Sequence, residues 1–502
     1  MRLCVIACFC GVVFATSLPS ADARVRWATP GEYRLNFSGL QSFVLDAENT
    51  PSIEGAFGLH RLRLQPQVEV GAVSVNIELD VLTGQIFGST SVLGARYWPR
   101  REGDPESAFE GWTTVEPREF WIEIGTRYLT LGLGQVADHW GMGLVANDGR
   151  RHEADRSSQT RIRRPGESAL GDLTDRLVLE LRPFAMSPLS RAGDAILAIG
   201  FDHVYQDDLS WLLHDLTLRG FGKFTWEAET FVGGLYYLYR YQTNRDGDPS
   251  RSGRYGGDYR YERSLIDAYA RWDFPLLLTG ARFFVEAEVV AGFGSTDLYP
   301  MALNHGNSVS MNQIGGAVRA EMAWVCPDIA AGIEVGYASG PGDADDANDS
   351  LTLDPDHRVG LILFPDVMRM LSLRAAGQFG TRGDFLPTRG GVRNALYFQP
   401  AISWRLGRMQ WVATFLTAWS GDPYFEPGPA GWRRTVNPFG YPTARHLGYE
   451  LDIGVEGAWT DDVNNGLIIG LDGGLFVPGS ALEGLTRRKV VGKLLGRISV
   501  RW

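Results

Sequence analysis

Apolar and polar residues alternate along nearly the whole chain, and this pattern limits the fold more than any other feature. In the stretch HRLRLQPQVEV (60–70), Leu62, Leu64, Val68 and Val70 are apolar, whereas the odd-numbered positions are polar. After the short 71–72 stretch the phase reverses, and the apolar side continues at odd-numbered positions. A period of two is that of a β-strand, and a tight turn that reverses the phase keeps one face continuous. The pattern therefore predicts β-hairpins with one apolar and one polar face.

The same pattern recurs in segments of about ten residues, the length that a tilted strand needs to cross the hydrocarbon of a membrane. We identify twenty candidate strands, of which 211–221 and 357–364 are the weakest, so that eighteen strands are nearly as well supported. The candidates are 34–47, 59–70, 72–83, 118–125, 127–137, 174–182, 194–205, 211–221, 223–241, 263–274, 281–292, 312–324, 329–338, 357–364, 370–381, 394–406, 409–420, 446–458, 466–477 and 491–502.

A soluble β-sandwich would also alternate, but the strands continue without a helix or a domain break, and their polar face is rich in charge. The apolar face ends in aromatic residues, which favour a membrane interface. These are Trp272, Trp324, Trp404, Trp459 and Trp502. A β-structure in lipid has to pair all its backbone groups, so it must close. We therefore predict an all-β fold: a closed antiparallel transmembrane β-barrel of about 18–20 strands.

The connections between candidate strands alternate between short and long. Short ones lie at 71–72, 125–127, 325–328, 365–369 and 407–408. Long ones lie at 84–117, 138–173, 242–262, 293–311, 339–356 and 421–445. Short periplasmic turns and long external loops are typical of outer-membrane barrels. With an even number of strands, both chain ends are expected in the periplasm.

Composition excludes several other classes. The formal net charge of −11 argues against a nucleic-acid-binding protein, which is usually basic. After residue 23, no run of 18 apolar residues predicts a spanning helix. The 61 glycines and 12% aromatic residues suit many turns and strands. Only three of the 48 basic residues are lysine. The others are arginine, whose planar guanidinium offers a rigid fork of donors.

The N-terminus reads as a targeting segment. Arg2 precedes the apolar run 3–18, and Ala21-Asp22-Ala23 matches an A-x-A cleavage site. We therefore predict a cleaved signal peptide at 1–23 and a single barrel domain at 24–502. A lipoprotein box ending at Cys8 comes too early in the apolar run to be favoured. Cleavage leaves Cys326 alone, so we expect no intramolecular disulfide and no cysteine metal site. We also expect no cofactor and no metal.

The chain ends in GRISVRW, another alternating strand. Ile498, Val500 and Trp502 fall on one face, and Arg497, Ser499 and Arg501 fall on the other. Together with the signal peptide and the amphipathic strands, this ending resembles the bacterial outer-membrane β-barrel proteins. The resemblance implies an outer-membrane location in contact with lipid and lipopolysaccharide. It also implies that the barrel-assembly machinery reads the final strand through Ile498, Val500 and Trp502.

Within that class, the length, the strand number and the arginine-bearing polar faces resemble large porins of the alginate-export type. The stretches WGMGLVANDG (140–149) and LDPDHRVGLILF (353–364) also resemble parts of related, uncharacterised outer-membrane barrels. This closer resemblance implies a transport protein.

A barrel of sixteen or more strands encloses an aqueous channel unless something plugs it. We therefore predict a porin for passive diffusion of small polar or anionic solutes, because rings of charge set the selectivity of pores. The predicted pore-lining residues are Arg61, Arg63, Glu69, Arg271, Glu286, Glu288, Arg319, Glu321, Arg393, Arg405, Glu450, Asp452, Glu456, Arg497 and Arg501. Alternatively, these charges only pair with each other across strands, at about 0.2–1 kcal/mol a pair.

Two functional alternatives remain. The first is a structural or adhesive barrel whose loops plug the lumen. The second, least favoured, is an outer-membrane lipase, because neither G-x-S-x-G nor H-E-x-x-H occurs in the chain. We therefore expect no catalytic residues.

Two motifs are open to two interpretations each. The arginine-rich stretch 147–167 is either a screen for anions at the pore mouth or a solvated loop of mixed charge. Tyr236, Tyr237, Tyr239 and Tyr241 either form a sugar-stacking path in the lumen or, as we favour, belong to an aromatic girdle.

Overall fold

The computed structural model describes most of the chain after the predicted signal peptide. The described residues are 25–46, 48–52, 55–88, 115–149, 162–166, 171–185, 193–207, 215–244, 260–276, 280–296, 308–324, 328–341, 349–372, 388–423, 437, 439–460, 465–486 and 489–502. The predicted signal peptide and Cys326 lie outside these residues. No helix among the described residues is both long and apolar enough to cross a membrane.

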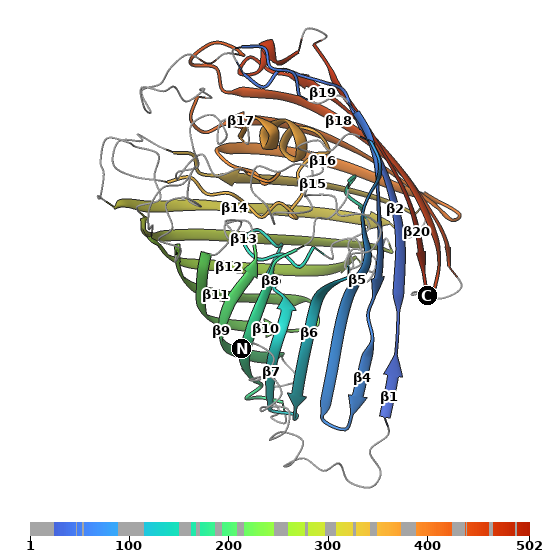
Figure 1. Ribbon diagram of the computed structural model, residues 1–502, viewed down its shortest axis with the longest axis vertical. Helices are drawn as coiled ribbons and strands as arrows, with labels where there is room; N and C mark the ends of the chain where they lie inside the picture. Colours follow the sequence, from blue (N-terminus) through green and yellow to red (C-terminus); the bar gives the residue numbers. More distant parts are fainter. Residues whose placement is uncertain are drawn as a thin grey trace.

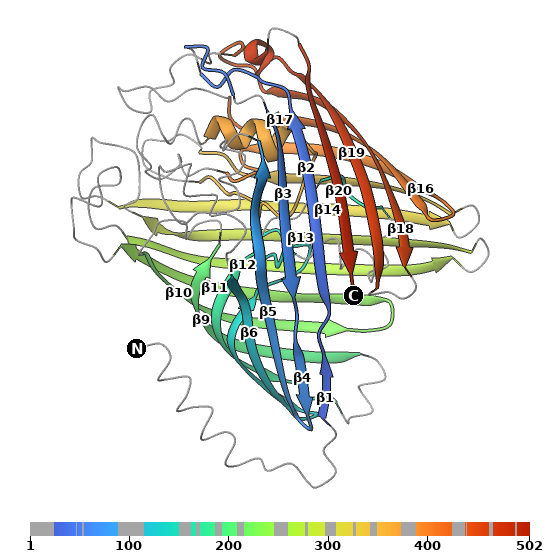
Figure 2. The same cartoon turned by 45° about the vertical axis from the view of Figure 1, so that its right-hand side comes forward.

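Twenty strand segments form one antiparallel sheet that closes on itself (Figures 1 and 2). Their bounds are β1 Val25–Ala28, β2 Gly31–Leu40, β3 Gly55–Leu64, β4 Gln67–Val70, β5 Val73–Phe87, β6 Glu116–Gly125, β7 Leu129–Ala137, β8 Leu173–Leu181, β9 Asp194–Gln206, β10 Asp215–Glu227, β11 Phe231–Asn244, β12 Arg260–Leu276, β13 Ala281–Thr296, β14 Val309–Trp324, β15 Ile329–Ala338, β16 Ala395–Leu406, β17 Met409–Ser420, β18 His446–Thr460, β19 Gly466–Pro478 and β20 Val491–Arg501. Closure comes from the pairing of β2 with β20, where Gly31 and Trp502 exchange backbone hydrogen bonds of 2.9 and 3.1 Å.

Two of the barrel strands are interrupted by proline. Pro30 separates β1 from β2, and Pro66 separates β3 from β4. Proline has no N–H group for the ladder, so each strand breaks where it stands. Because β1 continues β2, and β4 continues β3, the described residues form an 18-strand barrel. This confirms the lower of the two predicted strand numbers.

The two faces of the sheet are the reverse of those in a soluble protein. Apolar side chains on the outer face are exposed, such as Ile199 at 66% and Leu235 at 55%. Charged side chains on the inner face are buried, such as Asp202 and Glu288 at 0%. In lipid, the outer side chains are surrounded by hydrocarbon instead of water, so the alternation suits both environments. The prediction of a closed antiparallel all-β barrel is confirmed.

The five tryptophans that end the apolar face all lie at the end of the barrel with the short turns. Trp272 stands opposite Phe231, the first residue of β11, and their ring centroids are 4.9 Å apart. Trp404 stacks on Trp411 across the β16–β17 turn, at 6.1 Å. Trp502 packs over Gly31, where an added Cβ would meet its ring. Aromatic rings favour this interfacial position.

Three details of the predicted strand layout are wrong. Residues 357–364 form no strand but a turn leading into the π-helical turn Leu363–Met368, which also removes the predicted short turn at 365–369. The described part of 370–381, residues 370–372, is helical. The turn between β10 and β11 lies at 228–230, later than the boundary predicted at 222. Val359 and the run 361–364 are fully buried, so this stretch has no polar face and packs inside the barrel instead.

Candidate functional site

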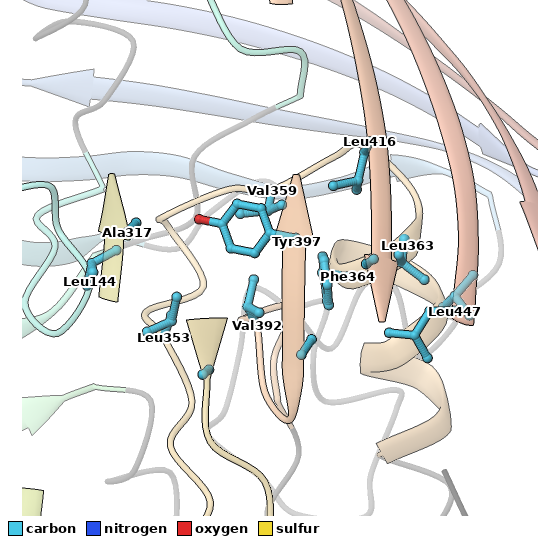
Figure 3. Packing of buried hydrophobic residues seen from close by; sticks show 14 of the residues in the cluster. Leu144, Ala317, Leu353, Val359, Leu363, Phe364, Val392, Tyr397, Leu416 and Leu447 are labelled. Carbon is cyan, nitrogen blue, oxygen red and sulfur yellow. The ribbon is translucent and has the colours of Figure 1, made fainter. Parts of the chain in front are cut away.

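Two segments fold from the long-loop end into the barrel. We call residues 138–149 and 162–166 the first inner segment and residues 349–372 the second inner segment. Leu144, Leu353 and Phe364 from these segments belong to one cluster of buried side chains that also includes Tyr397 of β16 and Leu416 of β17 (Figure 3). Burying a large apolar side chain contributes about 1.5–3 kcal/mol. The interior of the barrel therefore contains a true hydrophobic core.

Two carboxylates of the barrel wall hold these segments by their backbone. Glu288 of β13 accepts hydrogen bonds from the N–H groups of Met142 and Leu144, the latter at 3.1 Å. Glu450 of β18 accepts from the N–H groups of 361–363, at 2.8 Å for Ile362 and 2.7 Å for Leu363. Buried backbone N–H groups need acceptors, and a carboxylate is a strong one. Glu288 thus fastens the first inner segment to β13, and Glu450 fastens the second inner segment to β18.

The first inner segment also places two arginines on wall carboxylates. Arg163 donates to Asp472 of β19 at 3.0 Å, and Arg164 pairs with Glu334 of β15. The N–H of Gly166 donates to the same Asp472 carboxylate, also at 3.0 Å. These two arginines therefore belong to the barrel interior rather than to a solvated loop. Arg150, Arg151, Arg156 and Arg161 lie outside the described residues.

A compact ionic cluster surrounds Asp138, just after β7. Arg176 of β8 donates to its carboxylate at 2.8 Å, Lys223 of β10 at 3.0 Å, and Arg219 lies 3.5 Å away. Arg176 and Arg219 also bind Asp202 of β9. Burial alone would raise the pKa of Asp138, but Arg176 and Lys223 hold this pKa well below its ordinary value. The carboxylate is therefore ionised at neutral pH.

A second cluster gathers arginines around Glu32 at the start of β2. Its carboxylate accepts from Arg34 at 2.8 Å and from both Arg61 and Arg501 at 3.0 Å. Next to it, Arg63 pairs with Glu78 and Asp80, both at 2.8 Å. These contacts join β2, β3, β5 and β20, so the cluster ties the two strands at which the barrel closes.

Further ion pairs follow the inner face of β12 to β15. Arg271 lies 3.7 Å from Glu286, which accepts from Arg319 at 3.1 Å. Arg319 in turn binds Glu334 at 2.8 Å. On the other side of the interior, Arg497 pairs with Glu456. Charges of opposite sign thus alternate around this part of the wall.

The structure brings most of the predicted pore-lining residues into the interior, with three exceptions in position. Glu69 and Arg405 stand at the short-turn end, where their side chains are 56% and 53% exposed. Arg393 precedes β16 and donates to Thr352 at 2.6 Å. Glu321 and Asp452 are buried on the inner face. That the predicted residues line a pore remains a prediction.

Of the four tyrosines, one faces inward. Tyr236 is fully buried and its ring centroid lies 5.5 Å from that of Trp140. Tyr237 and Tyr239 are exposed on the outer face at 46% and 41%. The inward tyrosine belongs to the packing of the first inner segment, so these residues form no continuous aromatic path inside.

Several interior residues escaped the sequence analysis. Asp138, Arg176, Asp202 and Lys223 form the cluster described above, and Glu32 and Asp472 each hold an arginine from elsewhere in the chain. Alternation was a usable signal for those in strands, because Asp202 follows the outward Phe201 directly. Asp138 lies beyond its strand, where alternation no longer applies.

A small cleft lies between the first inner segment and the wall. Residues of the first inner segment form one side of it, and β14 to β17 form the other. Its lining consists of Ile162, Arg164, Arg319, Ala320, Glu321, Gly332, Ile333, Glu334, Gln399, Ala401 and Thr414. The interior is therefore narrowed by the inner segments but retains a small cleft beside them, lined by both apolar and charged residues.

Comparison with known proteins supports the fold. No family model matches the chain, and no curated protein matches its sequence. The Acinetobacter baumannii OccAB2 structure superposes with a TM-score of 0.51 at 9% identity and covers 94% of this chain and 98% of its own. OccAB1 from the same organism gives 0.50 at 8% identity, with 94% and 96% covered. The Pseudomonas aeruginosa OccK2 (OpdF) structure, solved with glucuronate, gives 0.49 at 8% identity, with 95% and 97% covered. The OccAB2 and OccAB1 superpositions show that the chain has the same barrel fold as these two structures.

Proposed function

We propose that the protein is an outer-membrane channel for passive diffusion of small polar or anionic solutes. The observation that carries this proposal is the pairing of an apolar outer face with an ionic inner face. An apolar band around a charged interior suits a barrel embedded in lipid that conducts polar solutes. Transport, and no catalytic step, is the activity that such an interior supports.

The interior charges guide the expected selectivity. At Glu32, three arginines share one carboxylate, and next to them Arg63 binds both Glu78 and Asp80. Around Glu286 and Glu334, arginines and carboxylates balance. A solute would therefore meet groups of both signs along the wall. We infer that the interior admits polar and anionic solutes without a strict charge filter.

A plugged structural barrel is the second candidate. The observation in its favour is the hydrophobic core formed by the inner segments, in which Leu144, Leu353 and Phe364 are buried. If this core closed the interior completely, the protein would be an adhesive or structural element without conductance.

Planar lipid bilayers distinguish these two functions. Purified protein is added to one chamber, single-channel currents are recorded, and the reversal potential is measured in a KCl gradient. A channel gives discrete current steps, and its reversal potential shows whether anions or cations pass more readily. A protein that inserts but gives no steps would contradict the channel and support the plugged barrel. Insertion is verified independently by protease protection in vesicles.

The biological setting is part of the same proposal. We infer delivery by the signal peptide at 1–23, contact with lipid and lipopolysaccharide, and recognition of Ile498, Val500 and Trp502 by the barrel-assembly machinery. These three side chains are 37%, 42% and 45% exposed on the outer face of β20 and beyond its end, where a partner can reach them. The closer resemblance to alginate-export porins remains a prediction.

A further inference from the structure

The cleft beside the first inner segment has one apolar and one polar side. Ile162 supplies the apolar side and packs onto Gly332, where an added Cβ would come within 3.0 Å of its Cδ1 atom. Arg164, Arg319, Glu334 and Gln399 supply the polar side. The glycine leaves room for the isoleucine, so the apolar side is built against the sheet wall.

The charged groups of the cleft are already engaged with one another. Arg319 binds Glu286 and Glu334, at 3.1 and 2.8 Å. Arg164 pairs with Glu334 and donates to the carbonyl of Arg358 at 2.7 Å. A further anion at this position would have to displace an internal carboxylate. The charges therefore shape the cleft without offering an unmatched positive charge.

The Gln399 amide is different. Its residue is only 5% exposed, it lines the cleft, and it forms no hydrogen bond with any described residue. Its two donor hydrogens and its acceptor oxygen are therefore available to a molecule in the cleft. Thr414, on the same wall, adds a hydroxyl that already donates to Asp452 at 3.1 Å. The open hydrogen-bonding capacity in this cleft is therefore that of a neutral group.

We propose that this cleft is a binding subsite for an uncharged sugar or polyol, held by the Gln399 amide. Neighbouring hydroxyls of such a solute both donate and accept, as the amide does. Its C–H face packs on Ile162, and its remaining hydroxyls lie along the planar guanidinium and carboxylate groups of Arg164 and Glu334. The inference rests on the proposed channel function and names a solute class for it.

The test compares D-glucose with D-gluconate, the open-chain six-carbon acid that corresponds to it and carries a carboxylate. Binding to the purified full chain in detergent is measured by saturation-transfer NMR and calorimetry. In parallel, glucose-induced interruptions of the current are counted in planar bilayers. The variant is Gln399→Leu. The matched control is Gln313→Leu, since Gln313 is a buried inner-face amide that already donates to the carbonyl of Ser350 at 2.6 Å.

We expect glucose to bind wild type more tightly than gluconate and to interrupt its current. Gln399→Leu should weaken glucose binding roughly 3- to 10-fold, the loss of one or two net hydrogen bonds, while Gln313→Leu leaves it unchanged. Tighter binding of gluconate, or equal glucose binding by both variants, would overturn the proposal. Conductance without glucose binding removes this inference alone. Binding without conductance removes the channel function and leaves the subsite. Heat-modifiable migration on gels confirms that each variant is folded.

Discussion

Replacing Glu450 by glutamine should release the second inner segment from the wall. Glu450 accepts hydrogen bonds from the N–H groups of Leu361, Ile362 and Leu363, and its carboxylate is almost fully buried. A glutamine side chain offers one oxygen in place of two. In Glu450→Gln, the Leu363 N–H faces an NH₂ group and loses its acceptor, while the other two bonds lose their charge.

The magnitude follows from these three bonds. A hydrogen bond to a charged group contributes about 1.5–3 kcal/mol, and a neutral one about 0.5–1.5 kcal/mol. Losing one bond and neutralising two therefore weakens the attachment by roughly 3–5 kcal/mol. At 1.4 kcal/mol for each factor of ten, the opening of residues 361–363 becomes about a hundred to a few thousand times more frequent.

Hydrogen–deuterium exchange with mass spectrometry measures this opening directly on the folded protein. Peptides that contain 361–363 should exchange faster in Glu450→Gln by that factor, while those of β18 and β19 change little. The reciprocal control is Glu288→Gln, which should accelerate exchange at Met142 and Leu144 and leave 361–363 as in wild type. Unchanged exchange at 361–363 in Glu450→Gln, or equal effects of both variants on both segments, would refute the reasoning.

Three further predictions concern the lipid face, the final strand and the Asp138 cluster. Ile453 is 50% exposed on the outer face and should tolerate leucine, whereas Ile453→Arg should lower the free energy of unfolding by about 2–4 kcal/mol, measured by urea titration in vesicles. Equal urea midpoints for the two variants would show that Ile453 does not face lipid. Deleting Trp502 should reduce the amount of protein in the outer membrane, measured by surface labelling. Arg501→Ala should assemble normally, because Glu32 keeps Arg34 and Arg61, and should change the reversal potential in bilayer recordings. The opposite result for the two variants would contradict the assignment of the two faces. Asp138→Asn should cost about 3–5 kcal/mol at pH 7, because it leaves Arg176 and Lys223 without a shared carboxylate. Folding lowers the pKa of Asp138, so its contribution to the free energy of unfolding is present above the ordinary carboxyl pKa and is lost as pH falls through the folded-state value. The urea midpoints of wild type and Asp138→Asn should therefore converge in acid. A difference that stays constant with pH would contradict this.

The barrel was predictable because each strand has one face in lipid and one inside, which makes alternation strict. The prediction of a strand at 357–364 is wrong because the chain there packs inside the barrel. It is buried on every side, so no alternation distinguishes its faces. Apolar character alone does not separate such an inner segment from a strand.

Alternation predicts which side chains face the interior of the barrel. It does not predict how far along the barrel they lie or with which residues they pair. Alternation correctly assigned Arg61 and Arg319 to the inner face, yet it gave no warning that Glu69 and Arg405 stand at exposed strand ends. Partners depend on which strands meet and on how a loop folds inward. Arg163 and Asp472 are 309 positions apart, and no local pattern links them. Gln399 also lies on the polar face of its strand, but only the fold shows that its amide has been left open.

The prolines at 30 and 66 divide the sheet mechanically. Beyond them, β1 and β4 pair with each other and β4 pairs with β5, but in the described part of the chain β1 forms no ladder with β20, whose pairing ends at Gly31 and Trp502. A pulling force applied at Val25 would therefore meet only the short β1–β4 ladder before reaching Pro30. The chain should then unzip in two separate force peaks, a weak one for β1 and a strong one for the closing pair β2–β20. The breaks at Pro30 and Pro66 therefore let β1 detach first, and the closing pair β2–β20 comes under tension only after β1 has separated.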